Sequence, residues 1–241
     1  MDNSEIGNNW TKITSNPLGN IVKGVYKDHN QIIAGAIRSH FNNKQIVAAD
    51  FGGGSGSLIK DLKRLINEKE LNFTNIDKDK SLLDEDSVSI KKIVAHLENV
   101  QLKDRFDLII MRYVLHYNSF NIQDKIIHKA RSLLKKEGLF ILHHCGSVDH
   151  THKQKLNKLF STPVISEKLV RKNPYWSTWS EISTLLKNNK FKIKVLEQYK
   201  IPIGDLYKQR YDLTDEEDKK LHDYLGSYDF IDYVISGNTL Q

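Results

Sequence analysis

The chain has 241 residues, 39% of them hydrophobic, which suits one large α/β domain with a lid better than two small domains. Its formal net charge is +6, but Lys residues are mixed with Asp and Glu along the whole chain, which indicates a solvated surface rather than a polyanion-binding face. The single cysteine, Cys145, excludes an internal disulfide, and no N-terminal segment joins a charged start to an apolar core, so we expect a cytoplasmic protein that does not span a membrane.

Short apolar segments alternate with helical patterns along much of the chain. The first helical pattern covers residues 19–41, and the apolar run IVAADF, residues 46–51, follows as a buried strand. Further helices are predicted over residues 58–66 and 123–136, the latter with its end marked by Lys135, Lys136 and Gly138. Further strands are predicted over residues 73–77, 91–97 and 138–146 and within residues 105–116. This alternation is typical of right-handed βαβ units in a parallel sheet that is covered on both faces.

The C-terminal part of the chain shows a different pattern. A helix is predicted over residues 176–191, with Ser177 or Ser180 as its N-cap. The alternating runs FKIKVLEQY, residues 191–199, and FIDYVISGN, residues 230–238, are typical of strands that close a parallel series as an antiparallel pair.

We therefore predict the α/β class, with a Rossmann-like, seven-stranded, mostly parallel sheet, a closing antiparallel C-terminal strand, helices on both faces and a helical lid. The whole chain, residues 1–241, forms a single domain in this interpretation. Residues 1–45 form an N-terminal helical cap, and residues 146–176 and 203–225 are lid insertions, the second containing a helix over residues 213–225. Aromatic walls for a small organic ligand are expected from Tyr26, His29, Tyr175, Trp176 and Trp179.

Four glycines occupy five consecutive positions at the end of the first predicted strand, within AADFGGGSGSLIKDL, residues 48–62. At the carboxyl end of a strand in an open α/β sheet, glycines allow a tight turn and bring backbone N–H groups and a helix N-terminus close to a ligand. A dinucleotide fingerprint would need Gly or Ala where Ser57 or Ile59 stands, and a P-loop would need Lys followed by Ser or Thr after Gly56. The spacing therefore indicates a ligand site, disfavours a nicotinamide cofactor and excludes a Walker A site.

The motif D-x-G-x-G-x-G, residues 50–56, with an acidic residue at the end of the second predicted strand, resembles the first motif of class I S-adenosylmethionine-dependent methyltransferases. The resemblance extends from about Ile46 to Gly146 and implies S-adenosylmethionine as the cofactor. It also implies that the glycine loop passes under the methionine part of the cofactor and that Asp77 accepts both ribose hydroxyls. A turn or helix N-cap role is the alternative for Asp77. The residues that the resemblance assigns to the cofactor are Asp50, Gly52, Gly53, Gly54, Gly56, Asp77, Lys78, His96, Leu97 and Arg112.

The end of the third predicted strand departs from the family pattern. The family often has Asp beside the adenine of the cofactor, where this chain has His96, followed by Leu97 and Glu98. Leu97 could still pack on the adenine face while a backbone N–H contacts the adenine edge. A surface position at the end of the strand is the alternative for His96.

The fourth predicted strand leads into the segment that lies beside the transferring methyl group in the resembled family. His116 stands where plant-type small-molecule O-methyltransferases place their catalytic base. Methyl transfer requires alignment, exclusion of water and, for a hydroxyl acceptor, a group that takes up the proton, which a histidine with an ordinary pKa of about 6.5 can do. A packed or hydrogen-bonded ring is the alternative for His116. Arg112 and Tyr113 could contact the carboxylate of the cofactor or the substrate, or pack at the strand end.

The run HHCGSVDHTH, residues 143–152, contains several residue types that can ligate a metal ion. We expect no metal there, because neighbouring residues of a strand point to opposite faces and no C-x-x-C or H-x-x-x-H pair is present. One of His143 and His144 is instead expected at the mouth of the active site, as a substrate contact or an alternative base. Ordinary packing is the alternative for both.

The segment after the fourth predicted strand bears on the substrate. Amino-methyltransferases that act on nucleic-acid bases usually have an Asn/Asp-Pro-Pro-aromatic turn there, whereas this chain has Met111–Val114. We therefore expect a small-molecule substrate, no nucleic acid and no membrane, in a monomer or homodimer. The preferred acceptor is an oxygen in specialised-metabolite biosynthesis, with nitrogen or carbon left open. The alternative is a methyltransferase-like protein that binds S-adenosylmethionine without transferring a methyl group, as a partner subunit or with other chemistry in the same pocket.

Overall fold

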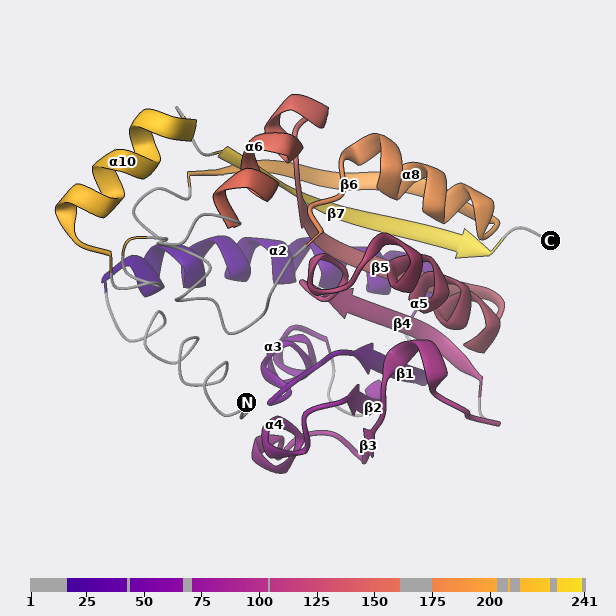
Figure 1. The fold of residues 1–241 in the computed structure, drawn as a ribbon. Helices are drawn as coiled ribbons and strands as arrows, with labels where there is room; N and C mark the ends of the chain where they lie inside the picture. Colours follow the sequence, from indigo (N-terminus) through magenta and orange to yellow (C-terminus); the bar gives the residue numbers. More distant parts are fainter. Residues whose placement is uncertain are drawn as a thin grey trace.

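A seven-stranded sheet with the order β3-β2-β1-β4-β5-β7-β6 forms the centre of the molecule (Figure 1). The computed structural model describes residues 17–42, 44–66, 71–103, 105–160, 175–202, 208, 213–225 and 229–239. The strands are β1 (Ile46–Phe51), β2 (Leu71–Asp77), β3 (Lys91–Val94), β4 (Phe106–Arg112), β5 (Leu134–Gly146), β6 (Phe191–Pro202) and β7 (Asp229–Thr239). β1 to β5 pair in parallel, and β7 is antiparallel to both β5 and β6. The predicted Rossmann-like fold with a closing antiparallel strand is confirmed.

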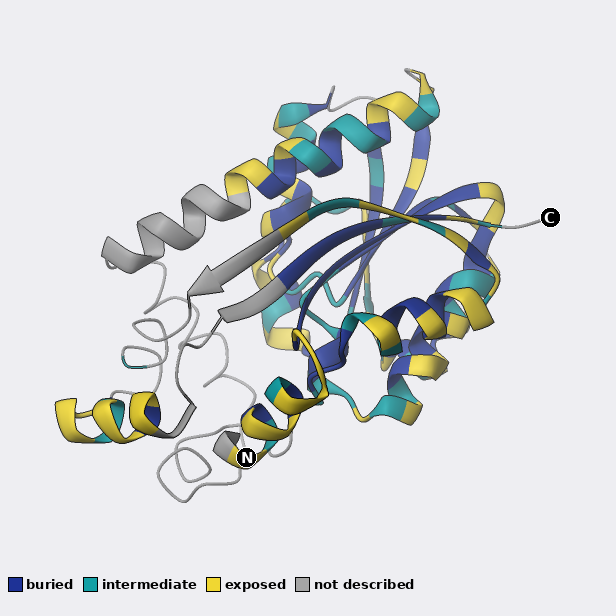
Figure 2. Ribbon diagram, turned by 90° about the horizontal axis from the view of Figure 1, so that it is seen from above, coloured by how far each residue is buried: buried dark blue, intermediate teal, exposed yellow. Residues whose placement is uncertain are grey.

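Helices pack against both faces of the sheet. The helices of the described residues are α2 (Pro17–Phe41), α3 (Ser57–Leu65), α4 (Lys80–Glu85), α5 (Phe120–Leu133), α6 (His150–Phe160), α8 (Trp179–Asn188) and α10 (Asp215–Leu225), with short 3₁₀ turns η2 (Leu97–Asn99) and η3 (Leu115–Tyr117). α2 and α3 bury apolar residues against one face, and α5 and α8 do so against the other. Figure 2 shows the resulting distribution, with buried residues in the strands and exposed residues on the outer sides of the helices.

Alternation along the strands assigns side chains to these two cores. Leu139 and Ile141 of β5 pack in the core under α2 and α3, whereas Phe140 and Leu142 pack in the core under α5 and α8. Because the parallel strands run in one direction, the carboxyl ends of β1, β2 and β4 meet at one edge of the sheet, where a ligand site is expected.

Several predicted element boundaries are wrong, including that of the strand predicted over residues 91–97, which ends at Val94, and two of them have a clear physical reason. α5 ends at Leu133, and Lys135 and Lys136 belong to β5, because Leu134 is buried and already pairs with Phe106 of β4. α8 is capped by Thr178 rather than by a serine.

The N-cap of α8 is a complete capping box. The Thr178 hydroxyl accepts from the Glu181 N–H, and the Glu181 carboxylate accepts from the Thr178 N–H at 2.8 Å. Ser177, one of the two serines predicted as the cap, instead donates to Gln123 Oε1 at 2.7 Å. Ser180, the other, lies in the first turn of α8.

The predicted cap and lid segments are described in part. α2 contacts α3, β5 and β7, and α6 and α10 contact each other (Figure 1). Residues 1–16, 43, 161–174, 203–207 and 209–212 of these segments lie outside the described residues, so the lid role stays a prediction. None of the helices in the described part of the chain is both long and apolar enough to cross a membrane.

Candidate active site

The glycine loop after β1 makes a series of left-handed turns. Gly52, Gly54 and Gly56 have φ values of +77°, +51° and +75°, a region that residues with a Cβ rarely adopt. The Gly52 N–H donates to the Ile76 carbonyl at 2.7 Å, which ties the start of the loop to the neighbouring strand β2. The backbone conformation of the loop therefore favours glycine at these three positions, whatever ligand binds there.

Space around the loop distinguishes Gly54 from the other glycines. A Cβ on Gly52 would approach Val114 Cγ2 to 2.4 Å, and the other two glycines of the loop likewise face side-chain atoms within 2.6 Å. A Cβ on Gly54 would meet only Leu82 Cδ1, at 3.7 Å. Gly54 is thus the loop position at which a ligand can approach the backbone.

Two side chains of β2 hold Gly54 in place. Asp77 Oδ2 accepts from the Gly54 N–H at 3.0 Å, and Asn75 Nδ2 donates to the Gly54 carbonyl at 2.9 Å. Asp77 Oδ1 accepts from the N–H of Asp79 at 2.9 Å. Asp79, not Asp77, is the N-cap of α4, where it accepts from the Ser81 N–H at 3.0 Å. The half-buried Asp77 carboxylate therefore orders the loop and still has lone pairs for a ligand.

Asp50 is a buried carboxyl group at the end of β1. Its side chain is 1% exposed, and its Oδ2 atom has no hydrogen-bond partner among the described residues. Burial raises the pKa of Asp50 to about 7, an effect opposed by the charge of Arg112 and reinforced by Asp77 and Asp86. Such a group is suited to pairing with a cation that enters the site.

Arg112 places a positive charge at the same edge of the sheet. Its guanidinium donates from Nη1 to Asn30 Oδ1 at 3.3 Å and from Nη2 to Ser57 Oγ at 3.2 Å. Ser57 is the first residue of α3, whose N-terminus carries the positive end of a helix dipole. Arg112 and the start of α3 together favour an anionic group such as a carboxylate.

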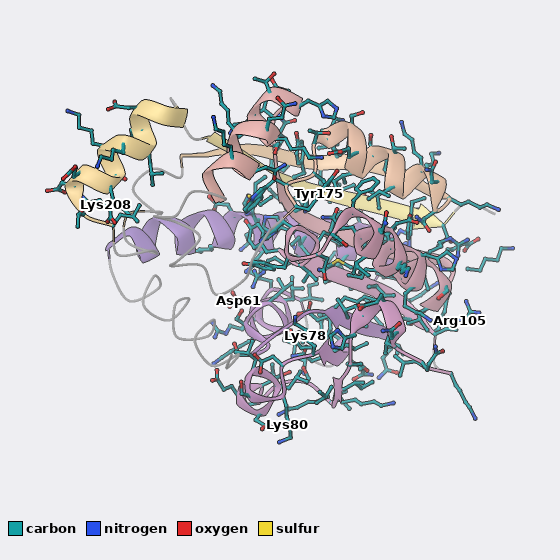
Figure 3. All side chains as sticks on the ribbon, viewed as in Figure 1. Asp61, Lys78, Lys80, Arg105, Tyr175 and Lys208 are labelled. Atoms are coloured by element: carbon teal, nitrogen blue, oxygen red, sulfur yellow. The ribbon has the colours of Figure 1, made fainter. Side chains whose placement is uncertain are left out.

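The remaining residues predicted to bind the cofactor, His96, Leu97 and Lys78, lie in different environments. The His96 side chain is 65% exposed, with Nδ1 3.7 Å from Glu98 Oε1, in agreement with the surface alternative. Leu97 is buried in the core under α5. Lys78 is exposed beside Asp77 and is labelled in Figure 3.

His116 and His144 lie on the face of the sheet that α5 and α8 cover. The buried His116 ring stacks on Trp176 at 4.8 Å, with 8° between the planes, and its centroid is 6.3 Å from that of His144. Burial lowers the pKa of His144 to about 4, so this ring is neutral at neutral pH.

His143 lies on the opposite face, as the strand alternation predicts. His143 Nε2 is 3.0 Å from Asp232 Oδ2, and the Tyr113 hydroxyl donates to the same oxygen. The ring of His29 from α2 lies 4.4 Å from that of His143. Tyr113 has a φ of +57°, a strained backbone for a non-glycine residue. Asp232 was missed by sequence reasoning because it is 89 residues from His143.

The predicted aromatic walls occupy several different places. Trp179 stacks on Tyr233 at 5.1 Å. Tyr175, which is labelled in Figure 3, donates to Glu181 Oε1 at 2.8 Å. Trp176 lies on His116, and His29 is packed in the buried cluster with His143. The side chain of Tyr26 lies outside the described residues. Trp176 and His29 are thus each placed beside a predicted catalytic histidine, His116 and His143 respectively.

Comparison with known proteins identifies a family and a shared fold. The sequence matches the family model described as Methyltransferase domain over residues 42–196. YcgJ protein from Bacillus subtilis has a TM-score of 0.69 at 16% identity, covering 88% of this chain and 99% of that chain. Magnesium protoporphyrin IX methyltransferase from Synechocystis, with bound SAH, has a TM-score of 0.65 at 15% identity, covering 99% of this chain and 95% of that chain. No curated protein matches the sequence significantly.

A more distant neighbour is also a methyltransferase. Phosphoethanolamine N-methyltransferase 2 from Haemonchus contortus, in complex with S-adenosyl-L-methionine, has a TM-score of 0.57 at 15% identity. The alignment covers 86% of this chain and 52% of that chain. At these identities the likenesses show the fold that the chains share.

The raised pKa of Asp50 predicts a specific pH dependence of stability. Between its ordinary value of 3.8 and about 7, the folded protein keeps a proton that the unfolded chain releases, so stability falls as pH rises through this window. Relative to Asp50→Asn, the free energy of unfolding of the wild type should therefore fall by about 3 kcal/mol from pH 4 to pH 7. Urea unfolding at several pH values measures this difference.

Asp223→Asn is the matched control, because Asp223 is an exposed carboxylate on α10. It should leave the pH profile of the wild type unchanged. Parallel profiles for wild type and Asp50→Asn would show that Asp50 is ionised in the folded protein at low pH and would refute the prediction.

Proposed function

We infer that this protein, which belongs to the methyltransferase domain family, binds S-adenosylmethionine and transfers its methyl group to an oxygen of a small organic acceptor. The family match supports methyl transfer as the reaction. The observation that carries the proposal is the loop at Gly54, held by Asp77 and Asn75 and open on its outer side. S-adenosylmethionine supplies a methyl group on a positively charged sulfur, which a nucleophile can displace.

The charged groups at this edge suit the amino-acid end of the cofactor. Asp50 would pair with the cationic amino group, since its Oδ2 has no other hydrogen-bond partner among the described residues. Arg112 and the N-terminus of α3 would hold the carboxylate. Asp77 would accept the ribose hydroxyls. We assign the exposed His96 no direct contact with the cofactor.

A small acceptor is supported by two features. Two of the structural neighbours are named for methyl transfer to magnesium protoporphyrin IX and to phosphoethanolamine, both of which are small molecules. The segment Met111–Val114 contains no Pro-Pro turn. We place the reaction in specialised metabolism, with an oxygen as the acceptor atom.

His116 is our candidate for the base that takes the proton of a hydroxyl acceptor. It follows β4 by four positions, and Val114, two residues before it, faces Gly52 of the cofactor loop. Stacking on Trp176 fixes the orientation of the imidazole ring. His144 is the fallback on the same face and His143 on the other, although burial makes His144 a weak base by lowering its pKa to about 4.

The reaction is tested by offering cofactor labelled in the methyl group together with panels of phenols, amines, carboxylates and acidic-carbon compounds. Transfer of label to a phenol or another hydroxyl is expected. Transfer only to nitrogen or carbon would contradict the oxygen assignment. Cofactor binding without transfer to any panel member would favour a binding protein over an enzyme of this class.

Gly54→Val and Asp77→Asn are each expected to weaken the binding of S-adenosylmethionine. The valine places a branched side chain at the open position of the loop, where φ is +51°. The asparagine removes one oxygen of a charged acceptor, a loss of about 1.5–3 kcal/mol, or about 10- to 150-fold in Kd. Isothermal titration calorimetry measures both effects.

Two control variants change the same residue types, glycine and aspartate, at other positions. Gly35→Ala adds a Cβ in α2 where nothing lies within 4 Å, and Asp79→Asn keeps a good N-cap on α4. Both should bind the cofactor as the wild type does. Unchanged affinity in Gly54→Val and Asp77→Asn would show that the cofactor does not lie on this loop.

His116→Gln is expected to lower the rate of transfer to a hydroxyl acceptor by about 10²- to 10⁴-fold, with little change in cofactor affinity. The wild-type rate should rise with pH as the base loses its proton, and the variant should lack this rise. Single-turnover rates across pH measure both. His128→Gln, at an exposed position of α5, is the control. A variant that keeps more than about a third of the wild-type rate would exclude His116 as the base.

A further inference from the structure

A second group of side chains, which includes the fallback base His143, meets beneath α2. His29 of α2, His143 of β5 and Asp232 of β7 each offer one ligand atom, and these atoms all lie within 4.8 Å of one another. All three residues are 0% exposed. We propose that His29, His143 and Asp232 form a binding site for one divalent transition-metal ion of the zinc class.

The donor set suits this class of ion. Zinc binds imidazole nitrogen and carboxylate oxygen at about 2.0–2.2 Å, which sets neighbouring ligand atoms of a tetrahedral site about 3.4 Å apart. His143 Nε2 and Asp232 Oδ2 are already 3.0 Å apart. The 4.8 Å limit on the whole group means that the atoms must move closer by no more than about 1.5 Å to reach tetrahedral spacing.

Tyr113 supports the carboxylate from outside the donor set. Its hydroxyl donates to Asp232 Oδ2, and its ring lies 4.4 Å from that of His143. Hydrogen bonds of this kind orient metal ligands, and their loss commonly weakens metal binding.

The charges around the ring of His29 are mixed. His143 and Arg112 oppose a positive charge there, whereas the carboxylates of Asp232 and Asp28 favour one. The case for an ion therefore rests on the arrangement of the donor atoms. Arg112 is itself hydrogen-bonded to Asn30 and Ser57.

No local sequence pattern predicts this group of three donors. Only His143 comes from the histidine-rich run 143–152, and the other two donors come from opposite ends of the chain. An ion bound here would join α2 to β5 and β7, the strands that α2 contacts. The ion would thus fasten the N-terminal helix to the sheet, in a role that does not depend on methyl transfer.

The test is the metal alone added to the full-length protein after treatment with a chelator. One equivalent of Zn²⁺ is expected to remain bound after gel filtration, measured by elemental analysis, and to raise the thermal midpoint. His29→Gln, His143→Gln and Asp232→Asn should each weaken binding at least tenfold, and Tyr113→Phe should weaken it less. His128→Gln should bind as the wild type does.

His29→Gln is the decisive variant, because it leaves the His143–Asp232 pair in place. Less than about a tenth of an equivalent of zinc on the wild type, or equal binding by His29→Gln, would overturn the proposal. Should the variants fail to fold, Co²⁺ added to the wild type provides the second measurement. Visible absorption bands of a tetrahedral site are expected, and their absence would also overturn it. Neither measurement uses S-adenosylmethionine, so a negative result leaves the methyl-transfer proposal intact.

Discussion

The fixed position of Gly54 is the constraint on which the rest of the site depends. Its N–H and its carbonyl are both held by side chains of β2, those of Asp77 and Asn75. Parallel pairing of β1 with β2 brings these side chains to the loop, because Asp50 and Phe51 align with Asn75 and Ile76. The loop therefore has its left-handed shape and its open side before any ligand arrives, which reduces the entropy lost on binding.

The alternation of one strand divides the remaining chemistry into two separate environments. His143 and His144 are neighbours in β5, yet His143 meets Asp232 on the α2 side and His144 meets His116 on the α5 and α8 side. Burial keeps His144 neutral by lowering its pKa, whereas His143 is paired with a buried carboxylate. A run of histidines in the sequence thus becomes two groups with different partners.

Short sequence patterns predict those strands and helix caps that depend on neighbouring residues in the chain. The strand Ile46–Phe51 follows from an apolar run, and the structure confirms it at the predicted boundaries. The sequence also contains the pattern of the α8 cap, since Thr178 and Glu181 have the spacing of a capping box. The prediction chose the neighbouring serines instead. No sequence pattern predicts the pairing of His143 with Asp232, because this pairing depends on the register of β5 against β7 across 89 residues of sequence.

Asp50 connects the stability of the free protein to its proposed ligand. A buried carboxyl oxygen without a hydrogen-bond partner among the described residues is costly, and the pKa of about 7 reflects the cost of ionising it there. Arg112 provides the opposite charge at the same edge of the sheet. An amino acid-like group carries both charges in complementary order, so its binding would satisfy Asp50 and Arg112 together. Because a ligand that binds only the folded state stabilises it by mass action, occupancy of this edge would offset part of the cost of burying Asp50.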